Sequence, residues 1–179
     1  YFDSLAGRVL DTLAESGLAE NTLVIYCSDH GEMAGEHGCW WKSNYYEGSV
    51  GVPMIASMPG VLPQGAMCSD ITNLMDIGPT LIDVAGGPPL HDSDGVSLWN
   101  TIKTGEPLNR DHTFSEHVGQ EGIPSRMIRT GVWKYYEYND ITPPALFNLE
   151  SDPGELTDLG TDPEFADLRT DLSHRLHEG

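Results

Sequence analysis

An aspartate, a histidine and a lysine within residues 25–42 (IYCSDHGEMAGEHGCWWK) could together bind a metal ion and an anion. The carboxylate of Asp29 suits a hard cation such as Ca²⁺, Mg²⁺ or Mn²⁺, and His30 would add a nitrogen ligand, which favours Mn²⁺ or a mixed nitrogen and oxygen site. Lys42 is the only lysine or arginine between Arg8 and Lys103, and its ammonium would meet an oxyanion as a compact point charge. A divalent metal beside a lysine suits displacement at sulfur or phosphorus, where charge builds on the non-bridging oxygens.

Other interpretations of these residues stay open. An aspartate after a strand often belongs to a turn, a neighbouring histidine is often a solvated loop residue, and a lysine is usually at the surface. A zinc site is also conceivable, with the ligands Cys27, His30, His37 and Cys39. His-x-Cys is not a usual pair of zinc ligands, however, and the spacing in HGEMAGEH differs from the HExxH of zinc proteases.

The composition narrows the class of protein. The chain has 179 residues, of which 39% are hydrophobic, so it can bury a core. Nine lysines and arginines stand against 28 aspartates and glutamates, which gives a net charge of −19. This charge would repel nucleic acid and an anionic membrane face, so neither is expected as a partner. No apolar run has the ~18 residues that would indicate a transmembrane helix.

Two continuous apolar runs, residues 23–27 (LVIYC) and 54–58 (MIASM), are typical of strands buried on both faces of a parallel sheet. Helices are predicted over residues 4–17 and about 76–85, the second with Asp76 as its N-cap. Only two such strands are evident, and both are too apolar for sheet edges. We therefore expect the sheet to be completed from elsewhere and the chain to be a fragment.

The predicted strand ends would place the candidate residues together. In open α/β sheets, ligands bind beyond the carboxyl ends of the strands, which is where Asp29 and His30 follow residues 23–27. The glycines of the next loop would let it fold back over this edge, so that Lys42 returns to the same pocket.

A second pattern begins after a Gly-, Pro- and Asp-rich stretch, residues 86–111, which we interpret as a loop. Short strands are predicted over residues 112–116, 125–129, 132–138 and 145–149. A final helix is predicted to begin at Asp162, with Pro163 as its first residue. The sequence thus predicts an α/β part over residues 1–105 and an α+β subdomain over residues 106–179, with an antiparallel sheet and a C-terminal helix.

Five phrases resemble, in order, the second half of type I sulfatases of the alkaline phosphatase superfamily. They are TLVIYCSDHGEMAGEHGCWWKSNYYEGSVGVPMIASMPG, MDIGPTLIDVAG, GVSLW, SRMIRTGVWKYYEY and LFNLESDPGELTDLG. The DHG form looks most like the choline-sulfatase, iduronate-sulfatase and phosphonate monoester hydrolase branches. The resemblance implies the C-terminal part of an alkaline phosphatase-like parallel-sheet sandwich, followed by the small α+β subdomain.

The same resemblance implies roles for individual residues. Asp29 and His30 match two metal ligands, with Ca²⁺ as the first expectation and Mn²⁺ or Mg²⁺ as alternatives. Lys42 matches the catalytic lysine that binds the oxygen of the sulfate or phosphate group. The family's nucleophile is a formylglycine made from the Cys or Ser of a C-x-P-S-R type motif, expected in a missing N-terminal half.

The resulting hypothesis is the C-terminal half of a metal-dependent sulfuric ester hydrolase, inactive alone. Its partners would be a small sulfate or phosphate ester and the missing N-terminal half, and a homo-oligomer is left open. One alternative is a phosphonate monoester or phosphodiester hydrolase of the same superfamily. Another is a truncated, non-catalytic binding module.

Overall fold

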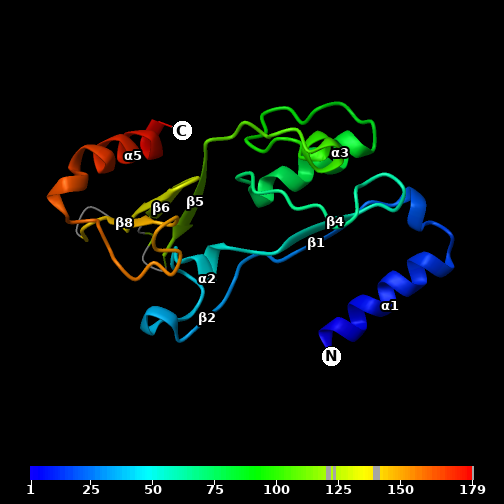
Figure 1. The fold of residues 1–179 in the computed structure, drawn as a ribbon, viewed down its shortest axis with the longest axis horizontal. Coiled ribbons are helices and arrows are strands. Elements are labelled where there is room, and N and C mark those ends of the chain that lie inside the picture. Colours follow the sequence, from blue (N-terminus) through cyan, green and yellow to red (C-terminus); the bar gives the residue numbers. More distant parts are fainter. Residues whose placement is uncertain (120–121, 123, 139–141, 179) are drawn as a thin grey trace. The chain divides into compact units, whose positions relative to one another are not determined.

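The computed structural model describes residues 1–119, 122, 124–138 and 142–178 (Figure 1). The chain divides into two compact units, Tyr1–Ser28 with Pro53–Leu108 and Asp29–Val52 with Asn109–Gly179. Across the described ranges, no helix combines the length and the apolar character that a membrane span requires.

The first unit contains the two apolar strands, β1 (Val24–Cys27) and β4 (Met54–Ser57). The prediction of these strands is confirmed, but the parallel sheet is not seen in the described residues. Instead β1 and β4 pair antiparallel in a two-stranded sheet, with Val24 opposite Ser57. The error has a physical reason. A continuous apolar run indicates that a strand can be buried on both faces. It does not indicate whether the neighbouring strand runs parallel or antiparallel.

The other regular elements of the first unit are helices and 3-10 turns, joined by loops. They are α1 (Phe2–Glu15), the 3-10 turns Ala19–Asn21 and Leu74–Asp76, α3 (Ile77–Val84) and α4 (Trp99–Thr104). The side chain that caps the turn before α3 is Asn73, whose Oδ1 accepts from the Met75 N–H at 3.0 Å. Asp76 supplies the other half of this capping box and is fully buried. Helix α4 lies inside the stretch predicted as a loop, so that part of the prediction is wrong.

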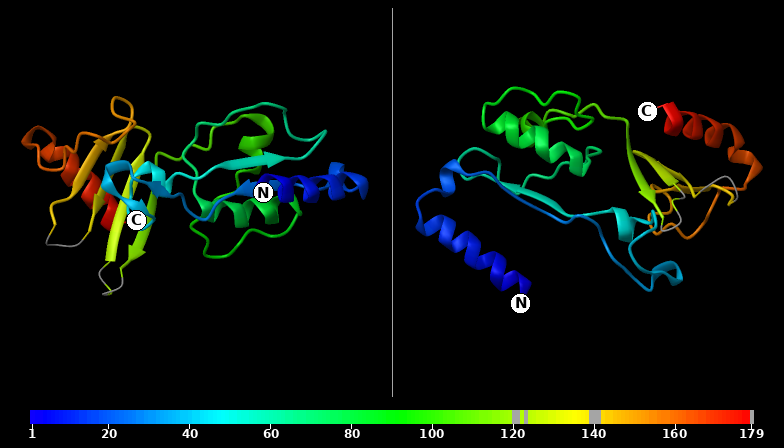
Figure 2. Two further views of the ribbon diagram at one scale, coloured as in Figure 1. Left: turned by 90° about the horizontal axis from the view of Figure 1, so that it is seen from below. Right: turned by 180° about the vertical axis from the view of Figure 1, so that it is seen from behind.

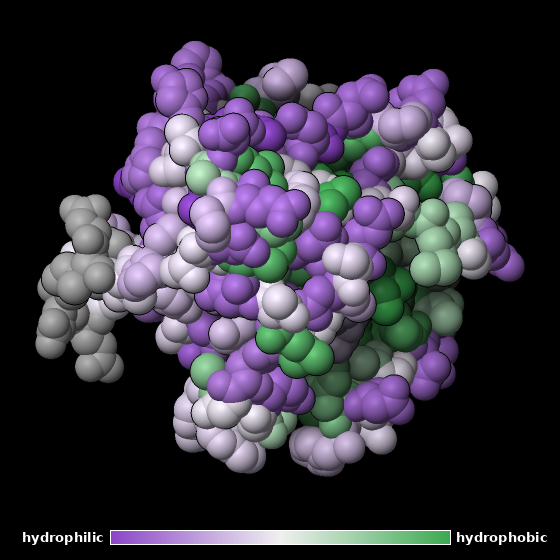
Figure 3. All heavy atoms as spheres, turned by 60° about the vertical axis from the view of Figure 1, so that its left-hand side comes forward, coloured by the Kyte–Doolittle hydropathy of each residue, from purple (hydrophilic) through white to green (hydrophobic). Residues whose placement is uncertain are grey.

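Apolar side chains remain uncovered in the first unit. Helix α1, which is described throughout, has no buried side chain. On the strands, Tyr26 is 42% and Ile55 60% exposed. On the face of the molecule shown in Figure 3, hydrophobic residues also lie between the hydrophilic ones. These side chains are available for burial against another surface.

The second unit is built on an antiparallel sheet in the order β5 (His112–Val118), β6 (Pro124–Thr130), β7 (Trp133–Glu137) and β8 (Ala145–Asn148). A 3-10 turn (Pro163–Phe165) and α5 (Ala166–Glu178) follow. The Asp162 side chain caps this turn by accepting from the Glu164 N–H at 2.9 Å. The predicted antiparallel sheet and C-terminal helix are confirmed.

Alternation along the strands gives this sheet two buried faces. Ile128, Tyr135 and Leu146 pack with Leu172 and Leu176 of α5, which lies against the sheet in both views of Figure 2. The opposite face is covered by residues 29–52, which include the short helix α2 (Glu47–Val50). The core on that side consists of Tyr45, Met127, Tyr136, Ala145 and Phe147.

Truncation of the fully buried Leu146 tests this core. Leu146→Ala should lower the free energy of unfolding by about 2–5 kcal/mol, because it leaves a cavity between β8 and α5. Leu156→Ala is the matched control, since Leu156 is 82% exposed and should cost no more than ~0.5 kcal/mol. Urea denaturation of the complete gene product measures both values. Equal losses in the two variants would contradict the assignment of the core.

Candidate functional site

A short hairpin brings the candidate residues together. Asp29 and His30 lie before strand β2 (Met33–Ala34), and Lys42 follows strand β3 (Trp40–Trp41). The two strands pair antiparallel, and the 3-10 turn Glu36–Gly38 connects them. The chain therefore reverses direction between His30 and Lys42, as the glycine-rich loop predicted.

The three side chains meet. Lys42 Nζ lies 2.8 Å from His30 Nε2, and His30 Nε2 lies 3.5 Å from Asp29 Oδ2. His30 Nδ1 is 2.7 Å from the carbonyl oxygen of Gly31. Because a carbonyl can only accept, the proton of the neutral ring belongs on Nδ1, and the lone pair of Nε2 is directed at the Lys42 ammonium.

The aspartate carries a negative charge at this site. The pKa of the Asp29 carboxyl is lowered, mainly because the backbone N–H of His30 donates to Oδ1 at 3.0 Å. Burial of the carboxyl opposes this shift, and the positive charge of Lys42 adds to it. An ionised carboxylate and an imidazole lone pair thus face one small region that already contains a cation.

This donor set fits part of a divalent metal site. A carboxylate oxygen and an imidazole nitrogen 3.5 Å apart are the ligand types expected for Ca²⁺ or Mn²⁺. In the part of the chain that the structure describes, no group of three or more His, Cys, Asp or Glu side chains could hold a metal ion. A complete coordination shell would therefore need ligands beyond these two, and the zinc alternative gains no support.

Backbone packing fixes the position of His30. The N–H of Gly31 donates to the Ser49 carbonyl of α2 at 2.7 Å. A Cβ at Gly31 would lie 2.1 Å from the Gly48 carbonyl oxygen, so only glycine fits against the helix here. A Cβ at Gly48 would likewise meet the sulfur of the buried Met33 at 2.8 Å.

Lys42 is held between two constrained neighbours. Trp41 and Ser43 have φ angles of 72° and 80°, a left-handed conformation that non-glycine residues rarely adopt. Beyond them, the buried Tyr45 hydroxyl lies 2.9 Å from Ser125 Oγ, which ties this segment to β6. On the hairpin side, the His37 ring stacks on Tyr46 with 3.9 Å between the centroids. Both flanks of Lys42 are therefore anchored in the second unit.

A cluster behind α2 is absent from the sequence-based predictions. Lys134 Nζ, on β7, lies 2.6 Å from Glu47 Oε1 and 2.7 Å from Glu155 Oε1. The signal available in the sequence is one lysine inside the aromatic run VWKYYEY. That pattern would place the lysine at the surface, whereas its side chain is 0% exposed.

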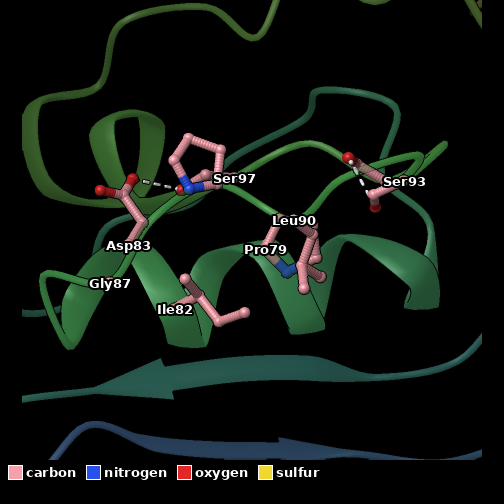
Figure 4. A pocket seen from close by; sticks show the side chains of 9 residues that line it. Pro79, Ile82, Asp83, Gly87, Leu90, Ser93 and Ser97 are labelled. Carbon is pink, nitrogen blue, oxygen red and sulfur yellow. Dashed lines mark hydrogen bonds between the residues drawn. The ribbon is translucent and has the colours of Figure 1, made fainter.

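The first unit contains a separate cavity of about 300 Å³, between α3 and the loop that follows it (Figure 4). Its lining consists of Pro79, Ile82, Asp83, Gly87, Pro89, Leu90, Ser93, Gly95 and Ser97. Asp83 Oδ2 accepts a hydrogen bond from Ser97 Oγ at 2.5 Å. None of the predicted site residues belongs to this lining.

Comparison with known proteins identifies the group to which this segment belongs. The family model for the C-terminal part of N-sulphoglucosamine sulphohydrolase matches residues 35–179, a range that includes Lys42. The chain belongs to the sulfatase family. The match corresponds to the C-terminal region of sulfatases and begins shortly after Asp29 and His30.

Curated sulfatases are similar to nearly the whole chain. Choline-sulfatase of Rhizobium meliloti is 39% identical over 91% of this chain and 32% of its own length. Human arylsulfatase K is 36% identical over 98% of this chain and 34% of its own length. The chain thus spans about a third of the length of the curated sulfatases it matches.

Solved structures share the fold of this chain. A protein in complex with its substrate, D-glucosamine-2-N,6-O-disulfate, has a TM-score of 0.88 and 28% identity over 96% of this chain and 36% of its own. The phosphonate monoester hydrolase of Agrobacterium radiobacter has a TM-score of 0.87 and 31% identity over 98% of this chain and 38% of its own.

Replacement of Gly31 tests the packing behind the site. Gly31→Ala should lower the free energy of unfolding by about 1–3 kcal/mol, since its methyl group overlaps the Gly48 carbonyl and forces the backbone to shift. The control is Gly7→Ala within α1, where no atom lies within 4 Å of the new methyl group. That variant should gain roughly 0.5–1 kcal/mol from helix propensity. Thermal and urea denaturation check both, and a neutral Gly31→Ala would contradict the close approach.

Proposed function

We propose that the complete protein is a metal-dependent sulfatase that hydrolyses a small sulfuric ester, and that this chain supplies part of its active site. Asp29 and His30 are two of the metal ligands, and Lys42 binds an oxygen of the sulfate group. The observation that carries the proposal is the meeting of these three side chains, with Lys42 Nζ 2.8 Å from His30 Nε2. The sulfatase relatives support the choice of substrate class.

The Nδ1 atom of His30 contacts the Gly31 carbonyl, so the lone pair of the neutral ring is on Nε2. The ammonium of Lys42 faces this lone pair. His30 would hold a divalent metal through that lone pair, and the ammonium of Lys42 could donate to an anionic oxygen nearby. A bound divalent metal would polarise the sulfate ester and neutralise charge. Asp29 and His30 would hold this ion, with the Nδ1 contact to Gly31 orienting the ring.

Lys42 would act on the sulfate group itself. Its ammonium can donate to a non-bridging oxygen, and the stabilisation grows as negative charge builds there in the transition state. Trp41 and Ser43, with their left-handed backbone, restrict where the lysine can reach. The formylglycine nucleophile implied by the resemblance would come from outside these 179 residues. The chain alone would therefore bind and stabilise charge without turning over.

Loss of the Lys42 ammonium should impair turnover. In the complete gene product, Lys42→Ala should lower kcat/KM for an aryl sulfate by about 10²–10³-fold, the usual effect of removing one charge-stabilising donor. Lys103→Ala is the control, because Lys103 is an exposed lysine on α4. It should retain wild-type rates. Steady-state kinetics on both variants decide the matter, and a Lys42→Ala enzyme as fast as wild type would refute the role.

Metal dependence gives an independent test of Asp29. Chelation should abolish sulfate hydrolysis, and titration with Ca²⁺, Mn²⁺ or Mg²⁺ should restore it. Asp29→Ala should raise the concentration required for half-recovery, whereas the exposed Asp167→Ala should leave it unchanged. Calorimetric titration reports the same affinities without turnover. Wild-type affinity in Asp29→Ala would remove the carboxylate from the metal site.

A phosphonate monoester or phosphodiester hydrolase is the second candidate. The 31% identity to the Agrobacterium radiobacter phosphonate monoester hydrolase favours it. Sulfate and phosphate-type esters differ mainly in charge, and the same metal and lysine would serve either. Rates of the complete gene product on an aryl sulfate, a phosphonate monoester and a phosphate diester separate the two activities. A non-catalytic module would hydrolyse none of them and would take up no metal.

The proposed complete protein also accounts for the uncovered strands. Strands β1 and β4 carry exposed apolar side chains on Tyr26 and Ile55 and form only a two-stranded sheet in the described residues. A preceding segment of the same polypeptide would extend this sheet and cover those side chains. The chain covers only 32–34% of the length of two curated relatives, which supports this arrangement.

A further inference from the structure

A buried ion cluster lies behind the candidate site. The side chain of Lys134 is 0% exposed, and its ammonium contacts Glu155, which is almost as deeply buried. The second carboxylate, on Glu47, approaches from α2 at 2.6 Å and is also 3.5 Å from Nε of Arg129. Two positive and two negative groups therefore balance in charge, and they join β6, β7, α2 and the loop after β8.

The cluster is stable only when all of its charged groups are present. A buried ammonium is costly unless carboxylates pair with it, and removal of one partner leaves an uncompensated charge. Burial alone would raise the pKa of Glu47, but Lys134 and Arg129 outweigh it and lower that pKa, so the carboxylate stays ionised. Glu155 is held in a left-handed conformation with φ 53°, which shows how closely its position is determined by its surroundings.

The cluster holds helix α2, which supports the site, in position. Glu155 Oε2 accepts from the backbone N–H of Glu47 at 2.6 Å, while Glu47 Oε1 pairs with Lys134. The backbone N–H of Glu47, the first residue of α2, is thereby tied to the loop after β8, and its side chain is tied to β7. Two residues further along α2, the Ser49 carbonyl accepts from the Gly31 N–H at 2.7 Å. The Gly31 carbonyl in turn orients the His30 ring.

We infer that Lys134, Glu155 and Glu47 are positioning residues for the Asp29, His30 and Lys42 site, acting through α2 and Gly31. The expected effect of these residues on hydrolysis rests on the proposed function, whereas their expected effect on the position of Gly31 does not. Charge-assisted hydrogen bonds depend on both distance and direction, so these contacts restrain where α2 lies against β7.

The test uses Glu47→Gln in the complete gene product, because this variant keeps the shape of the side chain and the backbone N–H while removing the charge. The matched control is Glu137→Gln on the same sheet. Glu137 is also a partly buried carboxylate with a lowered pKa, but its partners are Tyr135, Ser173 and His177, on the α5 side. Lys134→Met serves as the stronger variant if it folds.

The first readout is amide hydrogen exchange at Gly31, which requires no activity. Glu47→Gln should accelerate exchange of this amide about tenfold, the size expected for coupling within one contact network, while Glu137→Gln should leave it unchanged. Unchanged exchange in Glu47→Gln would overturn the inference, whatever the enzyme does. Equal acceleration in both variants would also overturn it, since it would reflect general loss of stability.

The second readout is a double-mutant cycle on sulfate hydrolysis. Glu47→Gln should lower kcat/KM about tenfold in the wild-type background and have almost no further effect in a His30→Ala background, because the imidazole that α2 and Gly31 position is then absent. Additive losses would assign Glu47 a merely structural role. A fully active Lys42→Ala enzyme with accelerated Gly31 exchange in Glu47→Gln would instead refute the proposed function and leave the positioning inference intact.

Discussion

The four-stranded sheet of the second unit buries both of its faces, and the position of every candidate residue depends on this constraint. Neighbouring residues on a strand point to opposite sides, so Ile128 and Leu146 face α5 while Met127 and Phe147 face residues 29–52. An antiparallel sheet often leaves one face in water. Here the second face is apolar too, and the segment that covers it is the one that contains Asp29, His30 and Lys42.

Because the chain has few lysines and arginines, the partner of each basic side chain is informative. With 9 lysines and arginines against 28 acidic residues, carboxylates are plentiful partners. Lys134 pairs with two of them, and Arg126 and Arg175 bond to Glu116 and Asp111. Lys42 differs, because its ammonium lies at an imidazole nitrogen rather than on a carboxylate oxygen. Because an ammonium has three N–H donors, Lys42 can still donate to an incoming anion.

Local patterns in the sequence predicted most elements and the antiparallel sheet of the second unit, but not how β1 and β4 pair. The apolar runs marked β1 and β4, and Asp162 with Pro163 marked the start of the last helix, because these signals come from adjacent residues. The direction of pairing between β1 and β4 depends on contacts between distant segments, which periodicity does not record. Helix α4 was missed because it is only six residues long and lies within a Gly- and Pro-rich stretch.

The candidate site was predictable to a similar depth. Residue type, the position after a strand and the glycine spacing predicted that Asp29, His30 and Lys42 lie close together. The support behind them was not visible, because Lys134 and Glu155 are separated by 21 positions and meet only in the folded chain. A lysine in a strand is normally exposed, and pairing with the buried Glu155 and the partly buried Glu47 explains why this one is not.

The two units differ in what stabilises them. Among the described residues, the buried apolar side chains lie almost entirely in the second unit, and Leu98 is the one that belongs to the first. Ordering a backbone costs roughly 1–2 kcal/mol per residue, which burial of apolar surface must offset. The first unit buries little apolar surface of this kind, and Tyr26, Ile55 and Val9 remain exposed in it. Burial of these side chains would add to the stability of the unit, and with it to that of β1, whose last residue is two positions before Asp29.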